Sequence, residues 1–243
     1  MAYSLCFDLG NSRLKCAVFN NAVLEEVVVL EDLSINTIHG LLQTYRPTHS
    51  ILSSVITGTE ELEATLNQHT VFCKLNHQSK LSFYTPVGKP ETIGADRLAI
   101  CNAAVDKYPG QHILVIVLGT CITYNYINSQ QQFLGGAISP GMTMRFKAMN
   151  LHTALLPEVK PDKIVPLIGY DTRTNLLSGV ILGIAKELEG FITEYKLRYS
   201  NLKVILAGGD VLWIQPQLNM EVETDEQLLF KGLYSIGKNN WKE

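Results

Sequence analysis

The sequence contains no block of lysine and arginine residues. Its 243 residues include 20 lysines and arginines against 23 aspartates and glutamates, which gives a formal charge of −3. Proteins that bind nucleic acids usually carry a basic stripe or patch. The nearest approach to one is Lys196, Arg198 and Lys203, and a solvated helix end explains these residues better. We therefore expect no nucleic-acid partner.

Long apolar runs are also missing. The longest unbroken apolar stretch, Ile113 to Leu118, is far shorter than the ~20 residues that a membrane-spanning helix needs. The first residues, from Met1 to Phe7, carry no positive side chain, and their apolar run stops at Asp8. A signal peptide begins with positive charge and continues with a longer apolar segment. These absences predict a cytoplasmic protein without a membrane segment.

The cysteines form no C-x-x-C pair, and their number, five, is odd. Four of them lie in apolar runs, where a thiol behaves as a small core residue. This usage favours a reducing compartment and argues against a zinc site. The chain is 46% apolar and 18% charged, as expected of a globular protein. Its length allows one large domain or two of about 120 residues each.

The main positive feature is an architectural repeat. Each half of the chain predicts three strands followed by helix, strand, helix, strand and helix. In the first half we expect strands at 3–7, 14–19, 23–29, 50–55 and 71–75, and helices at 35–45, 59–69 and 95–108. In the second half we expect strands at 112–117, 121–127, 132–138, 203–207 and 218–222. The second-half helices should begin at 139 (reaching about 150), at 171 or 172, and at 225 (reaching 236).

Strands that alternate with helices predict an α/β fold with mixed sheets. The order βββαβαβα in each half predicts two duplicated lobes, residues 1–109 and residues 110–243, with the division near Pro109–Gln111. Ligands commonly bind between such lobes. We therefore expect a cleft between the two lobes to contain the functional site.

Both halves place a glycine turn between their first two strands. The first turn reads Asp8-Leu9-Gly10-Asn11-Ser12 and the second reads Val117-Leu118-Gly119-Thr120-Cys121. Glycine permits a positive φ and lets a ligand approach the backbone closely, and the hydroxyl and amide side chains add donors for phosphate oxygens. An ordinary hairpin would also explain either turn alone. Two matching turns in a duplicated chain favour phosphate binding.

Two charged residues near the first turn extend this hypothesis. Lys15 could add a positive charge to phosphate oxygens if its side chain points into the cleft. Asp8, at the end of a predicted strand, is a candidate partner for Mg²⁺, through a water molecule because Mg²⁺ gives up its waters reluctantly.

A third motif, Gly94-Ala95-Asp96-Arg97, stands at the start of a predicted helix. Asp96 could accept a proton from a substrate hydroxyl while Arg97 holds charge beside it. A helix cap with an acidic first turn would produce the same pattern.

Two further glycine segments have equally open interpretations. Gly208-Gly209-Asp210 could let a nucleotide lie against the backbone or could form a plain turn. Gly135 to Gly141 ends at a predicted helix N-terminus, which could bind an anion or be a simple cap.

Together these motifs resemble those of the type III pantothenate kinases, in order and spacing and over nearly the whole chain. The matching segments are Asp8-x-Gly10-Asn11-Ser12-x-x-Lys15, Gly94-Ala95-Asp96-Arg97, Gly119-Thr120-Cys121-Ile122-Thr123, Gly135-Gly136-x-Ile138-x-Pro140-Gly141 and Gly169-x-Asp171-Thr172. The resemblance implies the fold of the acetate and sugar kinase/actin superfamily, with two ribonuclease-H-like lobes. It also implies transfer of the γ-phosphate of ATP to the 4′-hydroxyl of pantothenate, the first step of coenzyme A synthesis. Family members are homodimers that need Mg²⁺ and a monovalent cation, K⁺ or NH₄⁺.

The resemblance also assigns roles to individual residues. The ATP phosphate contacts would be Asp8, Leu9, Gly10, Asn11, Ser12, Arg13, Leu14, Lys15 and Thr120. The pantothenate contacts would be Gly94, Ala95, Asp96, Arg97 and Thr172, and Asp96 is similar to the family's general base. Phosphoryl transfer depends mainly on positioning and charge stabilisation, so a carboxylate of ordinary pKa can serve as this base.

The sequence departs from the family pattern at two positions. Val117 stands where the family usually has the aspartate that coordinates the monovalent cation, and valine cannot ligate K⁺. A substrate-contacting tyrosine of the family falls on Val87 without gaps, and Tyr84 could replace it if the loop carries an insertion. Val117 leaves open a second interpretation, a weak or inactive paralogue that binds pantothenate or nucleotide as a regulator. A third, a kinase for a sugar or acetate, is disfavoured by the Gly94–Arg97 motif.

Overall fold

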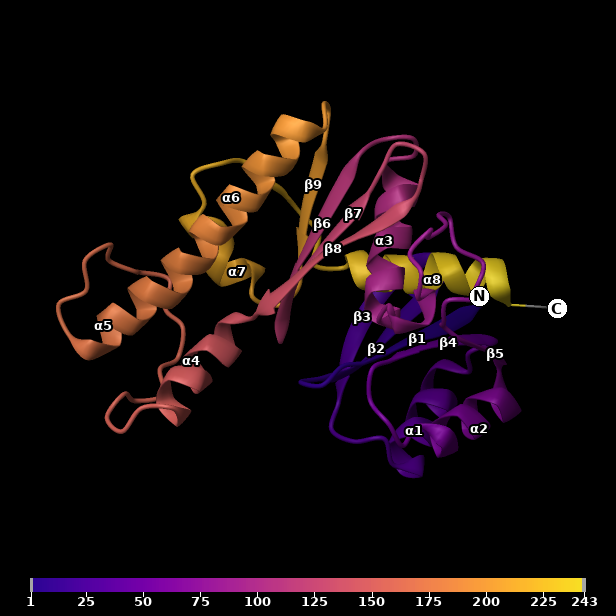
Figure 1. The fold of residues 1–243 in the computed structure, drawn as a ribbon. Coiled ribbons are helices and arrows are strands. Elements are labelled where there is room, and N and C mark those ends of the chain that lie inside the picture. The colour runs from indigo at the N-terminus through magenta and orange to yellow at the C-terminus, as the bar shows by residue number, and fades with distance from the viewer. Residues whose placement is uncertain (1, 242–243) are drawn as a thin grey trace. The chain divides into compact units, whose positions relative to one another are not determined.

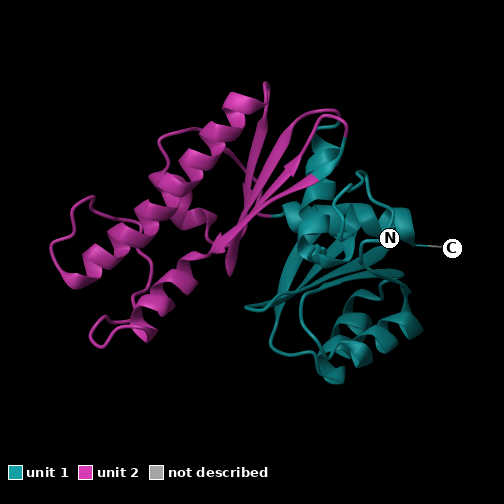
Figure 2. Ribbon diagram, in the orientation of Figure 1, with its two compact units in different colours: residues 1–109, 131–133, 227–243 teal, residues 110–130, 134–226 magenta. Residues whose placement is uncertain are grey.

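The structure is a computed structural model that describes residues 2–241, and these divide into two compact units (Figure 1, Figure 2). Unit 1 contains the described residues up to 109, together with 131–133 and those from 227 onward. Unit 2 contains residues 110–130 and 134–226. Each unit is an α/β structure built on one five-stranded sheet. The predicted fold class is therefore confirmed.

The sheet of unit 1 has the strand order β3-β2-β1-β4-β5. Its central strand, β1, is antiparallel to β2 and parallel to β4. The bounds are Tyr3–Leu9 for β1, Leu14–Asn20 for β2, Val23–Leu30 for β3, His49–Ser54 for β4 and Val71–Lys74 for β5. All five strands were predicted from the sequence to within one or two residues at each end.

The sheet of unit 2 repeats this order with β8-β7-β6-β9-β10. Its central strand, β6, is antiparallel to β7 and parallel to β9, as β1 is to β2 and β4. The bounds are Ile113–Leu118 for β6, Cys121–Ile127 for β7, Phe133–Pro140 for β8, Lys203–Ala207 for β9 and Glu223–Thr224 for β10. The identical pairing confirms the duplication that the sequence predicted.

One face of the first sheet is covered by α1 (Ile35–Tyr45) and α2 (Glu60–His69). Ser34 caps α1, because its hydroxyl accepts a hydrogen bond of 3.3 Å from the amide of Thr37. Alternate residues of the strands meet these helices in one apolar cluster that includes Leu5, Phe7, Leu9, Val18, Leu52, Ile38, Leu42, Leu62 and Leu66. Because successive side chains of a strand point to opposite faces, every second residue of these strands contacts α1 and α2.

The helices α3 (Ala95–Lys107) and α8 (Leu228–Asn240) pack against each other and against β4. A side chain at Gly232 would place its Cβ 1.9 Å from the carbonyl oxygen of Ala99, so only glycine permits this approach of the two helices. Helix α8 is the last helix of the chain, yet it belongs to unit 1 (Figure 2). Unit 2 therefore lacks this helix and residues 131–133, which the expected lobe 110–243 included.

The apolar face of the second sheet is covered mainly by a long helical segment. It begins as α5 (Thr172–Leu177), passes through a π-helical turn at Ser178–Leu182, and continues as α6 (Gly183–Arg198). Its buried residues Ile181, Ile184, Leu188 and Ile192 pack on Leu114, Ile116 and Leu118 of the sheet. A short helix, α7 (Val211–Ile214), follows β9. None of the helices within residues 2–241 has the length and apolar character to span a membrane.

The structure corrects the helix predicted at 139–150. Helix α4 spans Met142–Leu151, and Ser139 and Pro140 end β8 instead of capping the helix. The chain stays extended here because Gly141 packs on the second glycine turn, where its amide donates to the carbonyl of Thr120 at 3.1 Å. Proline closes the strand readily since it has no amide hydrogen to offer the ladder.

The strand predicted at 218–222 is also wrong, because only Glu223–Thr224 pairs as β10. The amide of Leu218 donates to the carbonyl of Gln215, and the amide of Asn219 donates to the Glu189 carboxylate. These bonds hold the segment in turns, and the following helix begins at Leu228 instead of Asp225.

Candidate functional site

The first glycine turn joins β1 to β2 through residues 10–13, which include three exposed side chains. The amide of Gly10 donates to the carbonyl of Arg13 at 3.2 Å and closes the turn. Neither Gly10 nor Gly119 uses the positive φ that glycine permits, because the described glycines with positive φ are Gly58, Gly110, Gly135, Gly136 and Gly208. A Cβ at Gly10 would meet nothing closer than the Arg13 oxygen at 3.5 Å. The protein itself therefore leaves room at Gly10, and close approach of a ligand stays a prediction.

The second glycine turn is a meeting point of three sequence motifs in unit 2. A Cβ at Gly141 would lie 2.0 Å from the Gly119 oxygen, and one at Gly208 would lie 2.3 Å from the Leu118 oxygen. The amide of Asp210 donates to the same Leu118 oxygen at 3.1 Å. The segments 135–141 and 208–210 thus hold this turn by backbone contacts that only glycine permits. Thr120 lies exposed at its tip.

Asp8, the acid beside the first glycine turn, has a raised pKa. In the sheet register it pairs with Lys15 of β2 and with Ser53 of β4, and residues paired across strands project from the same face. The pKa of Asp8 is raised to about 6: burial is the largest cause, the ammonium of Lys15 opposes it, and the carboxylate of Asp96 adds to it. Three predicted site residues, Asp8, Lys15 and Asp96, are therefore close enough within unit 1 to interact electrostatically.

Asp96 lies in the first turn of α3, and its carboxylate folds back over Gly94. A Cβ at Gly94 would be 2.5 Å from Asp96 Oδ1, so a larger residue at this position would displace the Asp96 carboxylate. Gly94 is the N-cap, and its carbonyl accepts from the amide of Leu98 at 3.1 Å. The free amides and dipole of a helix N-terminus stabilise a carboxylate there. The helix-cap interpretation and the functional one are thus compatible.

Arg97 and Tyr84 both contact segment 131–133 within unit 1. The Arg97 guanidinium lies 5.5 Å from the centre of the Phe133 ring, a distance at which the ring quadrupole attracts a cation. Segment 131–133 pairs with Tyr84, whose amide donates to the Gln131 carbonyl and whose carbonyl accepts from the Phe133 amide. The Tyr84 hydroxyl accepts from Gln132, and its side chain is 56% exposed.

In unit 2, Thr172 is the first residue of α5 and is exposed. The preceding residue, Asp171, forms a capping box with Thr174, in which its carboxylate accepts from the Thr174 amide at 2.7 Å. A Cβ at Gly169 would lie 2.4 Å from the amide nitrogen of Asn175, so glycine lets the chain turn tightly into the helix. The Gly169–Thr172 motif thus places Thr172 at a fixed helix start.

Val117 occupies in β6 the place that Asp8 occupies in β1, two residues before the turn glycine. Its neighbours in the sheet register are Thr123 and Ala207, whereas those of Asp8 are Lys15 and Ser53. Neither sheet neighbour of Val117 carries a charge. The two copies of the repeat therefore share a backbone but differ in the charge of their central strands.

The described residues contain no group of three or more histidine, cysteine, aspartate or glutamate side chains placed to hold a metal ion. Mg²⁺ is usually held by one or two carboxylates, with phosphate oxygens and waters as its other ligands. Asp8 supplies one such carboxylate, and the nearby carboxylate of Asp96 repels its charge, which contributes to the raised pKa of Asp8. A divalent cation would relieve that repulsion, so this donor set fits Mg²⁺.

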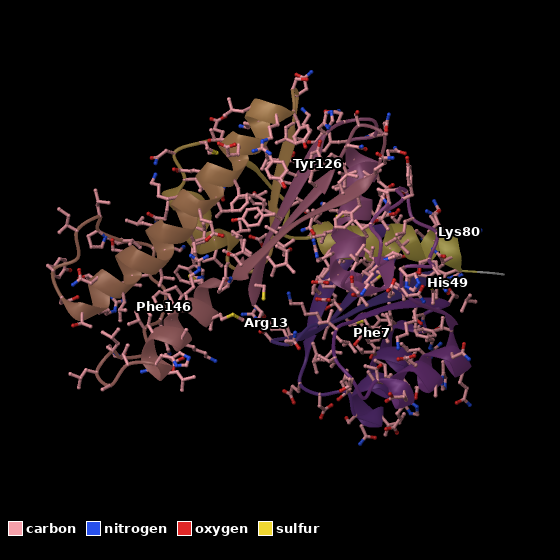
Figure 3. All side chains as sticks on the ribbon, in the orientation of Figure 1. Phe7, Arg13, His49, Lys80, Tyr126 and Phe146 are labelled. Carbon is pink, nitrogen blue, oxygen red and sulfur yellow. The ribbon has the colours of Figure 1, made fainter. Side chains whose placement is uncertain are left out.

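One buried polar residue beside Asp8 carries no sequence signal. Ser53 is fully buried, and its hydroxyl has no hydrogen-bond partner among the residues that the structure describes. Its place opposite Asp8 depends on the register of β1 and β4, strands that are 40 residues or more apart in the chain. Figure 3 shows Phe7, which precedes Asp8 in β1, and Arg13 of the first glycine turn.

Known proteins match the chain over nearly all of its length. Residues 4–194 match the family described as type III pantothenate kinase. The type III pantothenate kinase of Christiangramia forsetii is 38% identical over 235 residues, which are 96% of this chain and 97% of that protein. The one from Bacteroides fragilis is 38% identical over 234 residues, 96% of each chain.

Solved structures share the fold at low identity. A Campylobacter jejuni protein described as a Baf-family transcriptional activator matches with a TM-score of 0.64 and 21% identity, over 97% of this chain and 98% of that one. A glucokinase from an Antarctic psychrotroph matches with a TM-score of 0.53 and 12% identity, over 98% and 99% of the chains. These likenesses confirm the duplicated sugar-kinase type of fold.

The raised pKa of Asp8 makes the stability of the free protein depend on pH. The folded-state pKa of about 6 lies above the ordinary value of 3.8. Between these two pH values the folded protein keeps the Asp8 proton that the unfolded chain has lost, so the protein loses stability as the pH rises. Asp8→Asn removes the charge. It should raise the free energy of unfolding at pH 7.5 by roughly 1–3 kcal/mol, with no gain at pH 4, as measured by urea denaturation.

Asp32→Asn is the control for this prediction. Hydrogen bonds from Thr37 and Ser34 lower the pKa of Asp32, so this change should reduce stability at pH 7.5 instead of increasing it. A loss of stability in Asp8→Asn at neutral pH would contradict the assignment of Asp8 as a buried, strained charge.

Proposed function

The chain belongs to the type III pantothenate kinase family, and from this membership we infer which of its residues bind and transfer the phosphoryl group. As a pantothenate kinase, the protein phosphorylates pantothenate in coenzyme A synthesis. Kinases of this kind use ATP and a divalent metal. The observation that carries the residue assignment is the group formed by Asp8, Lys15 and Asp96 on unit 1.

We propose that the first glycine turn binds the phosphates of ATP, from Asp8 through Lys15. The room beside Gly10 and the exposed side chains Asn11, Ser12 and Arg13 support this assignment. Lys15 lies beside Asp8 in the sheet register, where its ammonium would add positive charge next to the bound phosphates. Asp8 would hold Mg²⁺ through water, and the ion would neutralise charge on the phosphates. Thr120, exposed at the tip of the second glycine turn, would be a further phosphate contact.

We further propose that Asp96 is the general base. A carboxylate there would accept the proton of the 4′-hydroxyl of pantothenate as that oxygen bonds to the γ-phosphorus and the bond to the β-phosphate oxygen breaks. Gly94 keeps the position of this carboxylate free, and Arg97 is held by its contact with Phe133. Gly94, Ala95, Arg97 and Thr172 would bind pantothenate, with Tyr84 as a further contact.

The alternative of a non-catalytic regulator has no comparable support. The relatives that share 38% identity are named as kinases. The Baf-family structure shares only 21% identity, which shows the fold alone.

Because ATP is the phosphate donor, we propose that the protein acts in the cytoplasm.

Val117 predicts an unusual dependence on monovalent cations. A valine with Thr123 and Ala207 beside it in the sheet offers no carboxylate to K⁺ or NH₄⁺. With purified protein, pantothenate and MgATP, we expect ADP release at similar rates in K⁺, NH₄⁺ or Na⁺ buffers. Strong activation by K⁺ would show that other groups coordinate the ion. An absence of ADP release in all buffers would overturn the kinase assignment and favour the regulator.

The role of Asp96 is tested by two substitutions that act in different ways. Asp96→Asn removes the base and should reduce kcat about 100-fold or more, while calorimetry still detects pantothenate binding. Gly94→Ala keeps the base but displaces its carboxylate, because the new Cβ would lie 2.5 Å from Oδ1, and it should also reduce kcat. Glu91→Gln, an exposed acid in the preceding turn, is the control. Near-normal turnover of Asp96→Asn would refute the assignment.

We also propose that the protein is a homodimer. The segment that precedes Thr172 carries an unusual set of exposed apolar side chains: Leu155, Ile164, Leu167, Ile168 and Tyr170. Leu155 is 91% exposed and Ile164 is 84% exposed. Large apolar side chains exposed along one segment favour an interaction surface there. Light scattering should give twice the chain mass of 27.0 kDa, and Leu155→Asp with Leu167→Asp should shift it towards the monomer. A monomeric wild-type protein would contradict the proposal.

A further inference from the structure

Ser53 is a buried polar residue that the proposed reaction does not yet use. It lies in β4, is completely inaccessible to solvent, and its hydroxyl has no hydrogen-bond partner among the described residues. Buried hydroxyls are almost always hydrogen-bonded, since an unpaired one costs folding free energy. A partner that becomes available only in another state of the protein would account for such a group.

The sheet register identifies that partner. Ser53 pairs with Asp8 across the parallel strands β1 and β4, so the two side chains project from the same face. On the other side, β5 ends at Lys74, which pairs with Leu52. Because Ser53 is inaccessible to water, the carboxylate of Asp8 is the acceptor that the register places next to its hydroxyl.

A second serine on the same strand provides an internal comparison. Ser50 is equally buried, and its hydroxyl is 2.6 Å from the hydroxyl of Thr70. It projects from the opposite face of β4, because successive residues of a strand alternate between faces. Ser50 therefore has the partner that a structural hydroxyl requires, whereas Ser53, on the face of the sheet that carries Asp8, has none.

We infer that Ser53 is a positioning residue for Asp8: its hydroxyl donates a hydrogen bond to the Asp8 carboxylate when Mg²⁺ and nucleotide phosphates occupy the first glycine turn. The inference rests on the phosphate-binding function proposed for that turn. The bond fixes the carboxylate in the orientation that holds the water shell of the cation. A charged acceptor makes such a bond stronger than one between neutral groups.

Two single substitutions separate this role from a structural one. Ser53→Ala deletes a hydroxyl that has no partner in the free protein, so the unfolding temperature should stay the same or rise. MgADP binding measured by calorimetry and the KM for MgATP should both weaken roughly tenfold, with the KM for pantothenate unchanged. Ser50→Ala should do the reverse, because it breaks an existing hydrogen bond: the unfolding temperature falls and nucleotide binding stays normal.

A double-substitution cycle tests whether Ser53 acts through Asp8. In an Asp8→Ala protein the acceptor is gone, so Ser53→Ala should cause no further loss of MgADP binding. Additive losses would mean that Ser53 acts on the nucleotide by another route, and the inference would be wrong. Wild-type MgADP affinity in Ser53→Ala, with an active parent enzyme, would also overturn it and leave the kinase function standing. An inactive parent enzyme that binds no MgADP would overturn both.

Discussion

The central strand of each sheet imposes the constraint on which the rest of the molecule depends. It is paired with an antiparallel strand on one side and a parallel strand on the other, so a tight turn and the end of the parallel strand lie at the same edge. In unit 1 this pairing gathers Asp8, Lys15 and Ser53, from three strands, on one face. In unit 2 it lets Gly141 and Gly208 contact the backbone of the second glycine turn. The chemistry proposed for the kinase depends on the side chains gathered at this end of the central strand.

The charge of the Asp8 carboxylate destabilises the protein when no ligand is bound, and it would help to bind Mg²⁺ and phosphates. Burial and the neighbouring Asp96 raise the pKa of Asp8, while Lys15 offsets only part of the effect. The hydroxyl of Ser53 adds a buried donor without a partner. Bound Mg²⁺ and phosphates would complement these groups, which is typical of sites that are organised for a ligand at the expense of stability.

The duplication preserved the backbone and changed the chemistry. The strand orders of the two sheets correspond strand for strand, yet Asp8, Lys15 and Ser53 of the first correspond in position to Val117, Thr123 and Ala207 of the second. Backbone pairing is shared by all residues, whereas the charge of a site depends on single side chains. Divergence at Val117 could therefore proceed without loss of the sheet.

The sequence alone determined the strands and most of the helices of the first unit, the duplication, and the resemblance that led to the family. These features depend on local periodicity, caps such as Ser34, and glycine motifs, all of which a linear reading can detect. Only the tertiary structure decided that α8 packs on α3, that three glycine motifs meet at one turn, that Gly94 makes room for the Asp96 carboxylate, and that Ser53 lies beside Asp8. Each of these facts is a contact between residues that no local pattern connects, because register and close backbone approach are set by the packing of the whole unit.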